Sequence, residues 1–251
     1  MATVVLVRHG RSTANTSGVL AGRTPGVLLD DHGEAQVAAL GARLTDVRFA
    51  AAVTSPLERC VATATAALSQ VPDDLRPSLV HDPAVLECDY GEWQGRTIAE
   101  LAKEPLWSVV QAQPSRVTFP GGESMGEMSH RVVRAVREHD ARIEAEHGPG
   151  AVWLLASHGD PLKAVLADAL GMHLDLFQRV MVDPASVSVV RYSAARPYVV
   201  TMNSAAGDLG WLTPPPSPDD TPHVAPHGGT TASDDAVIGG GAGAPTGGSA
   251  A

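Results

Sequence analysis

The chain has 251 residues, 44% hydrophobic and 18% charged, a mixture that supports a globular core and excludes collagen-like, coiled-coil and fully disordered classes. Its formal net charge of -10 argues against a nucleic-acid partner, because proteins that grip phosphate backbones present a broad basic surface. The length exceeds the ~150 residues of a typical domain but lies within the reach of one α/β unit, so we expect one domain with an appendage.

Short apolar runs alternate with longer amphipathic ones along residues 1–212. Thr3 to Val7 is apolar on both faces, as in a buried parallel strand, and Gly33 to Leu44 carries apolar residues at helical spacing. Ser55 is expected to cap the next helix. The pattern further predicts strands over 50–54, 152–156, 187–192 and 198–202, and helices over 55–69, over 161–170 and after residue 124. This order predicts a three-layer α/β/α sandwich with a mostly parallel sheet.

The composition changes abruptly after Trp211. Residues 213–251 contain eight glycines, seven prolines and four aspartates, but no lysine, arginine or aromatic residue. Such a segment cannot bury enough apolar surface to offset its chain entropy, which predicts a disordered, acidic Pro/Gly-rich tail. We expect its deletion to leave folding and kinetics nearly unchanged, because it offers little apolar surface for docking.

The cysteines and the N-terminus indicate the compartment. Cys60 and Cys88 are too few for a disulfide scaffold and lack the pairing of a metal site, which favours a reducing cytoplasm. Arg8 and His9 end the first apolar run early, whereas a signal peptide needs ~7 to 15 apolar residues. No apolar run approaches the ~20 residues that cross a bilayer, so no membrane partner is expected. The oligomeric state is left open, and a homodimer is one alternative.

Two histidines directly follow predicted strands. His9 comes after the first strand and His158 after the strand over 152–156, and each precedes a glycine that lets a ligand approach the backbone. Ligands of open α/β sheets bind beyond the carboxyl ends of the strands, so we expect both imidazoles at one edge of the sheet. Arg59, in the first turn of the following helix, points to the same edge, and a later loop adds Glu87.

A zinc site is one interpretation of this cluster, because zinc accepts two histidines and a carboxylate as ligands. Arg8 and Arg59 decide against it, since permanently charged guanidinium groups repel a dication. The same groups match the oxygens of a phosphate bidentately. The residues therefore predict an anion site that contains imidazoles, with no metal and no other cofactor.

Four sequence blocks now identify a family resemblance. They are Arg8-His9-Gly10, Thr54-Ser55-Pro56-Leu57-Glu58-Arg59, Glu87-Cys88-Asp89-Tyr90-Gly91-Glu92-Trp93 and Ser157-His158-Gly159. In this order and spacing they resemble the histidine phosphatase superfamily, the phosphoglycerate mutase-like proteins, over about residues 3–203. One Arg-His-Gly triplet is a weak signal, but the four blocks together are highly specific. The chain looks most similar to the small bacterial phosphomonoesterase and phosphomutase branch.

The resemblance implies a role for each residue of the cluster. His9 would be the nucleophile, Glu87 the proton donor, and Arg8, Arg59 and His158 the groups that hold the phosphoryl oxygens. Two further phosphoryl contacts are implied at Asn15 and Gly22, although Asn15 fits a loop cap equally well. These roles are chemically sound, because neutral imidazole attacks phosphorus and cations stabilise the transferred group. The expected activity is metal-independent hydrolysis of a small phosphomonoester through a phosphohistidine, with residues 1–212 as the catalytic domain.

Departures from the family pattern concern the substrate. Phosphoglycerate mutases carry a lysine where this chain has Ile98, and a long insertion with paired arginines that is here a short helical lid. A mutase is therefore the alternative and not the expected activity. Arg11 adds a positive charge at the pocket mouth for a second anionic group, and Trp107 is expected to pack the lid. The sequence does not identify the leaving group.

Other classes fit less well. The Gly-Glu-Ser-Met-Gly run around Ser124 matches the nucleophile elbow of serine hydrolases, with His158 as a candidate base. A Pro-Gly-Gly break precedes it, and Ser124 with Glu127 predicts a helix capping box instead. A cysteine phosphatase is excluded, because no arginine stands six residues after Cys60 or Cys88. A non-catalytic phosphate-binding protein has no reason to keep nucleophile, acid and cations together.

Overall fold

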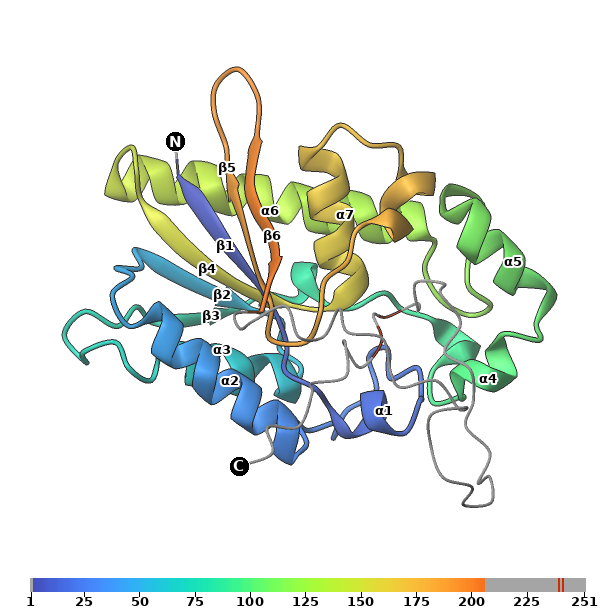
Figure 1. Cartoon of the computed structure of the whole chain (residues 1–251). Coiled ribbons are helices and arrows are strands. Elements are labelled where there is room, and N and C mark those ends of the chain that lie inside the picture. Colours follow the sequence, from blue (N-terminus) through green and yellow to red (C-terminus); the bar gives the residue numbers. More distant parts are fainter. Residues whose placement is uncertain (1, 206–238, 240, 242–251) are drawn as a thin grey trace, which may run out of the picture.

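The computed structural model describes residues 2–205 together with Gly239 and Gly241 (Figure 1). A six-stranded sheet has the order β3-β2-β4-β1-β5-β6. The strands are β1 (Thr3–Arg8), β2 (Ala51–Thr54), β3 (Leu79–His81), β4 (Val152–Ser157), β5 (Val187–Arg191) and β6 (Tyr198–Ser204). The helices are α1 (Thr13–Thr16), α2 (Asp31–Leu44), α3 (Glu58–Leu68), α4 (Ile98–Leu101), α5 (Pro105–Ala112), α6 (Met125–His147) and α7 (Gly159–Ala169). Four short 3-10 helices cover Pro83–Val85, Gly91–Trp93, Pro114–Arg116 and Leu174–Arg179.

The parallel part of the sheet brings the two histidine-bearing strand ends together. β1 pairs with β4 in parallel, and β4 pairs with β2, which pairs with β3, in the same sense. Arg8 is opposite Ser157 in the register, so His9 and His158 leave the sheet side by side. β5 is antiparallel to both β1 and β6. The predicted mostly parallel sheet is thus confirmed.

Helices cover both faces of the sheet, with α6 and α7 on one face and α2 and α3 on the other (Figure 1). The alternation of β1 explains the two cores. Val4 and Leu6 pack into the cluster that contains α6 and α7 residues, while Val5 and Val7 pack into the cluster of α2 and α3. The three-layer α/β/α fold is therefore confirmed.

Two local predictions were wrong. The α3 helix begins at Glu58, because Leu57 is its N-cap with extended backbone and no side-chain cap bond. Ser55 does not cap this helix and turns its hydroxyl toward His158 instead. The β3 strand was missed, since it has only three residues, none of them fully buried, and so shows no buried apolar run.

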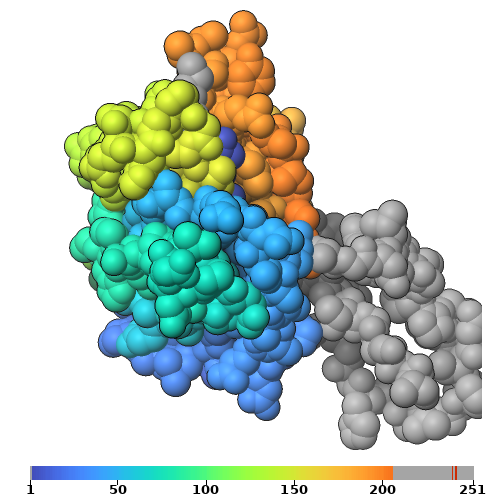
Figure 2. All heavy atoms as spheres, turned by 90° about the vertical axis from the view of Figure 1, so that its left-hand side faces the viewer, coloured from blue at the N-terminus to red at the C-terminus, as the bar shows by residue number. Residues whose placement is uncertain are grey.

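The remaining outer parts frame the carboxyl edge of the sheet. α4 and α5 form a short helical insertion beyond this edge, on the right in Figure 1. Figure 2 shows the β5–β6 region, in orange, projecting at the top of the molecule. In the described part of the chain, no helix has the length and hydropathy to cross a membrane. The predicted disorder of residues 213–251 lies outside the described residues, except at Gly239 and Gly241.

Candidate active site

His9 is buried at the end of β1 in a defined tautomer. Its Nδ1 lies 2.8 Å from the carbonyl oxygen of Gly10, which can only accept, so Nδ1 carries the proton. The Nε2 lone pair is consequently available. Burial, together with the charges of Arg59 and Arg8, lowers the pKa of His9 well below its ordinary value. The imidazole is neutral at neutral pH, as a nucleophile must be.

His158 follows β4 and faces His9, with ring centroids 5.3 Å apart and ring planes at 63°. Its Nε2 lies 2.8 Å from the Ser55 hydroxyl. Burial, then the charges of Arg59 and neighbouring groups, lowers the pKa of His158 well below its usual range. A neutral imidazole in this place offers one N–H, and Ser55 fixes its orientation.

Two buried guanidinium groups supply positive charge. Arg59, in the first turn of α3, donates through Nη2 to the Gly22 carbonyl at 2.7 Å. Its buried Nη1 has no hydrogen-bond partner among the described residues, so a donor is left for a ligand oxygen. Arg8 donates through Nη1 to the Val182 carbonyl at 2.8 Å. Burial lowers the pKa of Arg8 to about 10, which still leaves it charged at neutral pH.

Glu87 is the buried acid of the cluster. Burial first, and then the nearby charge of Asp160, raises the pKa of Glu87 to about 8. The Cys88 amide donates to its carboxyl group at 2.9 Å, and Arg23 donates to the Glu87 carbonyl at 2.9 Å. Glu87 is therefore held in place and largely protonated at neutral pH, which is the state of a proton donor.

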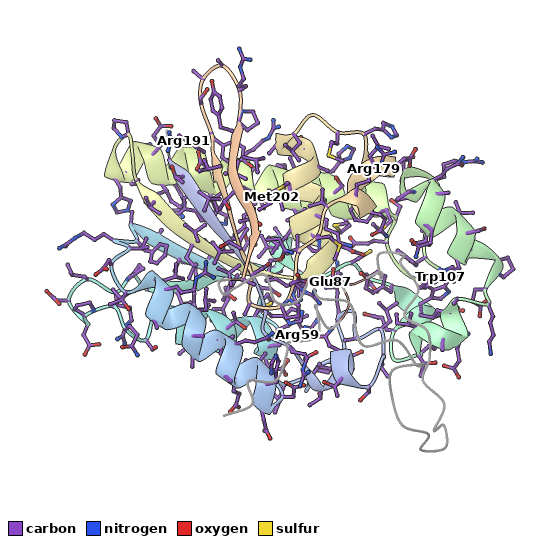
Figure 3. All side chains as sticks on the ribbon, viewed as in Figure 1. Arg59, Glu87, Trp107, Arg179, Arg191 and Met202 are labelled. Carbon is purple, nitrogen blue, oxygen red and sulfur yellow. The ribbon has the colours of Figure 1, made fainter. Side chains whose placement is uncertain are left out.

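A cavity of about 270 Å³ opens onto His9, Arg59 and Glu87, while Arg8 and His158, both buried, are not among its lining residues. Its lining consists of His9, Ser12, Ala14, Asn15, Gly18, Val19, Leu20, Ala21, Gly22, Arg59, Glu87, Tyr90, Ile98, Gly239 and Gly241. Figure 3 shows Arg59 and Glu87 near the centre of the molecule, at the carboxyl edge of the sheet, with Trp107 farther out on α5. The structure thus brings together in one place the residues that the sequence selected from separate blocks.

Two tail glycines lie at the cationic end of this cavity. Arg8 Nη2 donates to the carbonyl of Gly241 at 3.0 Å and to that of Gly239 at 3.3 Å. These oxygens use a guanidinium edge that a phosphoryl group would also use. We expected little docking of this tail, but its residues Gly239 and Gly241 contact Arg8.

The sequence family can now be compared with this geometry. A profile described as the histidine phosphatase superfamily (branch 1) matches residues 4–205. The chain belongs to this histidine phosphatase superfamily.

The chain is similar to relatives with different names. Phosphoserine phosphatase 1 of Hydrogenobacter thermophilus is 27% identical over 209 residues, 81% of this chain and 92% of that protein. A 2,3-bisphosphoglycerate-dependent phosphoglycerate mutase of Brucella anthropi is 32% identical over 174 residues, 65% and 79% of the two chains. Mycobacterial relatives are 34% identical over 194 residues, and the chain spans about half of their length. The structure of Bacillus stearothermophilus YhfR superposes with a TM-score of 0.72 at 25% identity, covering 81% of this chain and 98% of that one.

Asn15 and Gly22, the two further positions that the family resemblance selected, both lie at the cavity. Asn15 lines the cavity, but its side-chain oxygen accepts from the amide and the hydroxyl of Ser12, as a loop cap does. Gly22 also lines the cavity, at a positive φ of 52°, and a side chain there would collide with Gln94. Gly22 is thus required by both its backbone conformation and the space available.

Contacts bear on further residues of the sequence analysis. Arg11 is paired with Asp30 through Nε at 2.8 Å and its side chain is 30% exposed, so a role toward a second anionic group stays a prediction. Ser124 donates to Glu127 at 2.8 Å and caps α6 in a full capping box, and no strand directly precedes it. The nucleophile-elbow interpretation is therefore wrong. Trp107 stacks on Trp93 with centroids 6.3 Å apart, which confirms its packing role in the lid.

Three supporting residues hold the site in ways that sequence reasoning did not predict. Ser55 orients His158, and the Thr63 hydroxyl accepts from the Gly10 amide while donating to the Arg59 carbonyl at 2.7 Å. Tyr90 donates to the buried carboxylate of Asp160 at 2.7 Å. Ser55 stood inside one of the recognised blocks, so only its assignment was wrong. Thr63 carried no signal that separates it from an ordinary helix residue.

Proposed function

We propose that this histidine phosphatase hydrolyses small-molecule phosphomonoesters through a phosphohistidine intermediate on His9. The observation that carries the proposal is the tautomer of His9, whose proton is held on Nδ1 by Gly10 while Nε2 stays unprotonated in a buried site. Family membership supports the same reaction class, since the superfamily is one of histidine phosphatases.

In the first step, the Nε2 lone pair of His9 attacks phosphorus and the bond between phosphorus and the ester oxygen breaks. The departing alkoxide takes the proton of Glu87, so the alcohol leaves neutral. Arg59 and Arg8 stabilise the charge on the equatorial oxygens, with an additional N–H from His158. His9, His158 and Glu87 are already buried and hydrogen-bonded for this step, while a phosphoryl group at Arg8 displaces the carbonyl oxygens of Gly239 and Gly241.

In the second step, water attacks the phosphohistidine. Glu87, now a carboxylate, takes a proton from that water, the bond between phosphorus and Nε2 breaks, and inorganic phosphate leaves. His9 returns to its starting tautomer and Glu87 to its protonated state. The reaction is proposed to be metal-independent, because two buried guanidinium groups already supply the positive charge that a dication would otherwise provide.

Phosphomutase activity is the alternative, and the similarity to a phosphoglycerate mutase supports it. A mutase must retain a second anionic group beside the phosphoryl site, and the pairing of Arg11 with Asp30 weakens one candidate for that role.

A turnover screen over phosphomonoesters, with chelator present, tests the proposal. We expect release of inorganic phosphate, and quenched mass spectrometry should find phosphate on His9 during turnover. Activity that disappears on chelation and returns with a divalent ion would refute metal independence. Phosphate on another residue alone would refute the assignment of His9, and conversion of 3-phosphoglycerate to its 2-isomer without phosphate release would establish the mutase.

We also propose a cytoplasmic location. Cys60 and Cys88 are both free and buried. Burial raises the pKa of the Cys60 thiol to about 12, so it stays protonated and unreactive at neutral pH. Subcellular fractionation of the producing cell would check this proposal.

A further inference from the structure

Part of the cavity lining forms an uncharged wall. Ala14, Val19, Leu20, Ala21, Tyr90 and Ile98 line it. Leu20 and Tyr90 are almost fully buried. A leaving group that extends from a phosphate on His9 would therefore meet carbon atoms and one phenol ring.

This wall is held by main-chain bonds between two loops. Leu20 donates to the Arg96 carbonyl at 2.9 Å, and Gly95 donates to the Leu20 carbonyl at 2.8 Å. Ile98 donates to the Gly18 carbonyl at 2.8 Å, and Val19 forms an isolated bridge with Thr97. These bonds fix the loops before substrate arrives, so the wall is preformed and a charged leaving group could not push it aside cheaply.

Three arginines on the loops around the cavity are already engaged. Arg11 is paired with Asp30 at 2.8 Å, as described above. Arg23 is paired with Glu123 at 2.7 Å. Arg96 is paired with Glu104 at 2.6 Å. The paired carboxylates already neutralise these guanidinium groups, so an anionic leaving group would gain less from them than from an unpaired cation.

The contacts of Gly239 show what this wall accepts. A Cβ at Gly239 would lie 3.1 Å from Leu20 Cδ1 and 3.7 Å from the Tyr90 hydroxyl, so an uncharged main chain lies against the wall. The Gly239 carbonyl is turned to Arg8 at the same time. Gly239 thus places an oxygen atom on the Arg8 guanidinium group and carbon next to Leu20. A phosphomonoester of an apolar alcohol would place its phosphoryl oxygen and its carbon atoms in the same way.

We propose that the substrate class is phosphomonoesters of uncharged, largely apolar alcohols, of alkyl or aryl type, and that the wall of Leu20, Tyr90 and Ile98 selects them. Alcohols that carry a carboxylate or a second phosphate are rejected, because the wall gives their charge no partner. This inference rests on the proposed phosphatase function and specifies its leaving group.

A matched pair of esters tests the inference. Phenyl phosphate and 4-carboxyphenyl phosphate have the same shape near phosphorus and differ in one remote charge. The carboxyl-bearing phenolate is the slightly better leaving group, so chemistry alone favours the charged ester. We expect kcat/KM for phenyl phosphate to exceed that for 4-carboxyphenyl phosphate by about tenfold, equivalent to about 1.4 kcal/mol.

Two variants make the comparison specific to the wall. Ile98→Lys places a cation at the half-exposed edge of the cavity and should raise relative turnover of the carboxyl ester about tenfold. Ala102→Lys adds the same charge at an exposed position just after α4 and should leave the ratio unchanged. Equal change in both variants would show a general effect of net charge and would overturn the role of the wall.

The outcomes separate this inference from the proposed function. Equal kcat/KM for the two esters, with phosphate still found on His9, overturns the substrate class and leaves the phosphatase intact. Absence of turnover on any phosphomonoester, including p-nitrophenyl phosphate, overturns the proposed function and this inference with it. Preference for phenyl phosphate that Ile98→Lys weakens and Ala102→Lys does not supports both.

Discussion

The two ends of the active-site cavity are built from different kinds of structure. At the phosphate end, His9 and Arg59 project from a strand end and a helix start, and their charges or lone pairs face one point. At the other end, loops around Leu20 and Ile98 present an uncharged wall held by main-chain bonds. In the proposed mechanism, the first end binds the phosphoryl group that every phosphomonoester shares. In the proposed substrate class, the second end selects the alcohol, so a variant at each end should change a different kinetic property.

The largest effect is expected from His9→Ala. Removal of the nucleophile abolishes the phosphohistidine route, so kcat should fall by about 10⁴-fold or more on every ester. Stopped assays and circular dichroism would separate lost chemistry from lost folding. Retention of more than about one hundredth of the activity, with an intact spectrum, would mean that another group carries the phosphoryl transfer.

Arg59→Ala should have the next largest effect. Its unpartnered Nη1 is placed for an oxygen common to all phosphomonoesters, so kcat/KM should fall about 10²- to 10³-fold for alkyl and aryl esters alike. Arg134→Ala is the matched control, because the Arg134 side chain is 74% exposed on α6 and should leave kinetics unchanged. A loss confined to one ester class would place Arg59 at the leaving-group end instead.

Glu87→Gln should distinguish ester classes at the phosphate end. Loss of the proton donor should slow alkyl phosphates about 10²-fold and p-nitrophenyl phosphate much less, because that leaving oxygen needs little protonation. The comparison holds when transfer to His9 limits the rate. If dephosphorylation limits it, both esters slow through lost activation of water, and a burst of alcohol release reveals this. Equal losses without a burst would leave Asp89 or Glu92 as the acid.

The pH profile provides a further test of Glu87. Its raised pKa of about 8 means that kcat/KM of the wild type should fall as the pH rises through about 8, where the proton leaves. The neutral state of His9 persists well below its ordinary pKa, so no loss from that group is expected between pH 6 and 7.5 on this reasoning. Glu87→Gln should lack the alkaline decline. Persistence of the decline in the variant would assign it to another group.

The smallest effect is expected from deletion of residues 213–251. The deletion removes two carbonyl oxygens from Arg8, which a phosphoryl group must otherwise displace. We expect KM and the inhibition constant of inorganic phosphate to fall about threefold, with kcat and melting temperature nearly unchanged. A drop in melting temperature well outside error would show instead that the segment stabilises the domain.

Sequence reasoning succeeded where the signal is local. The apolar run of β1, followed at once by Arg8 and His9, contains both a buried strand and its polar end, so the sheet and the phosphate end could be predicted together. The α6 capping box at Ser124 is equally local, with its partner three residues away.

Sequence reasoning failed where a residue's hydrogen-bond or ion-pair partner is distant in sequence. Ser55 before Pro56 has the pattern of a helix cap. Only the folded chain shows that the Ser55 hydroxyl forms a hydrogen bond with His158, 103 positions away. Arg11 similarly reads as a free cation until the loop that ends at Asp30 returns beside it. The wall of Leu20 and Ile98 arises from two loops that no local pattern connects.

The position of β1 in the sheet has a consequence for how the chain folds. β1 precedes its neighbours β4 and β5 in the chain, and both of them follow α6, so its two hydrogen-bonding edges and the face that packs on α6 and α7 must wait for most of the domain. During translation β1 is an unpaired, apolar strand, and such segments are prone to aggregation and are shielded by chaperones. Because His9 and His158 meet only when β1 and β4 pair, recovery of activity after dilution from denaturant should report the completion of this long-range pairing, which only the β1–β5 pairing exceeds in sequence separation.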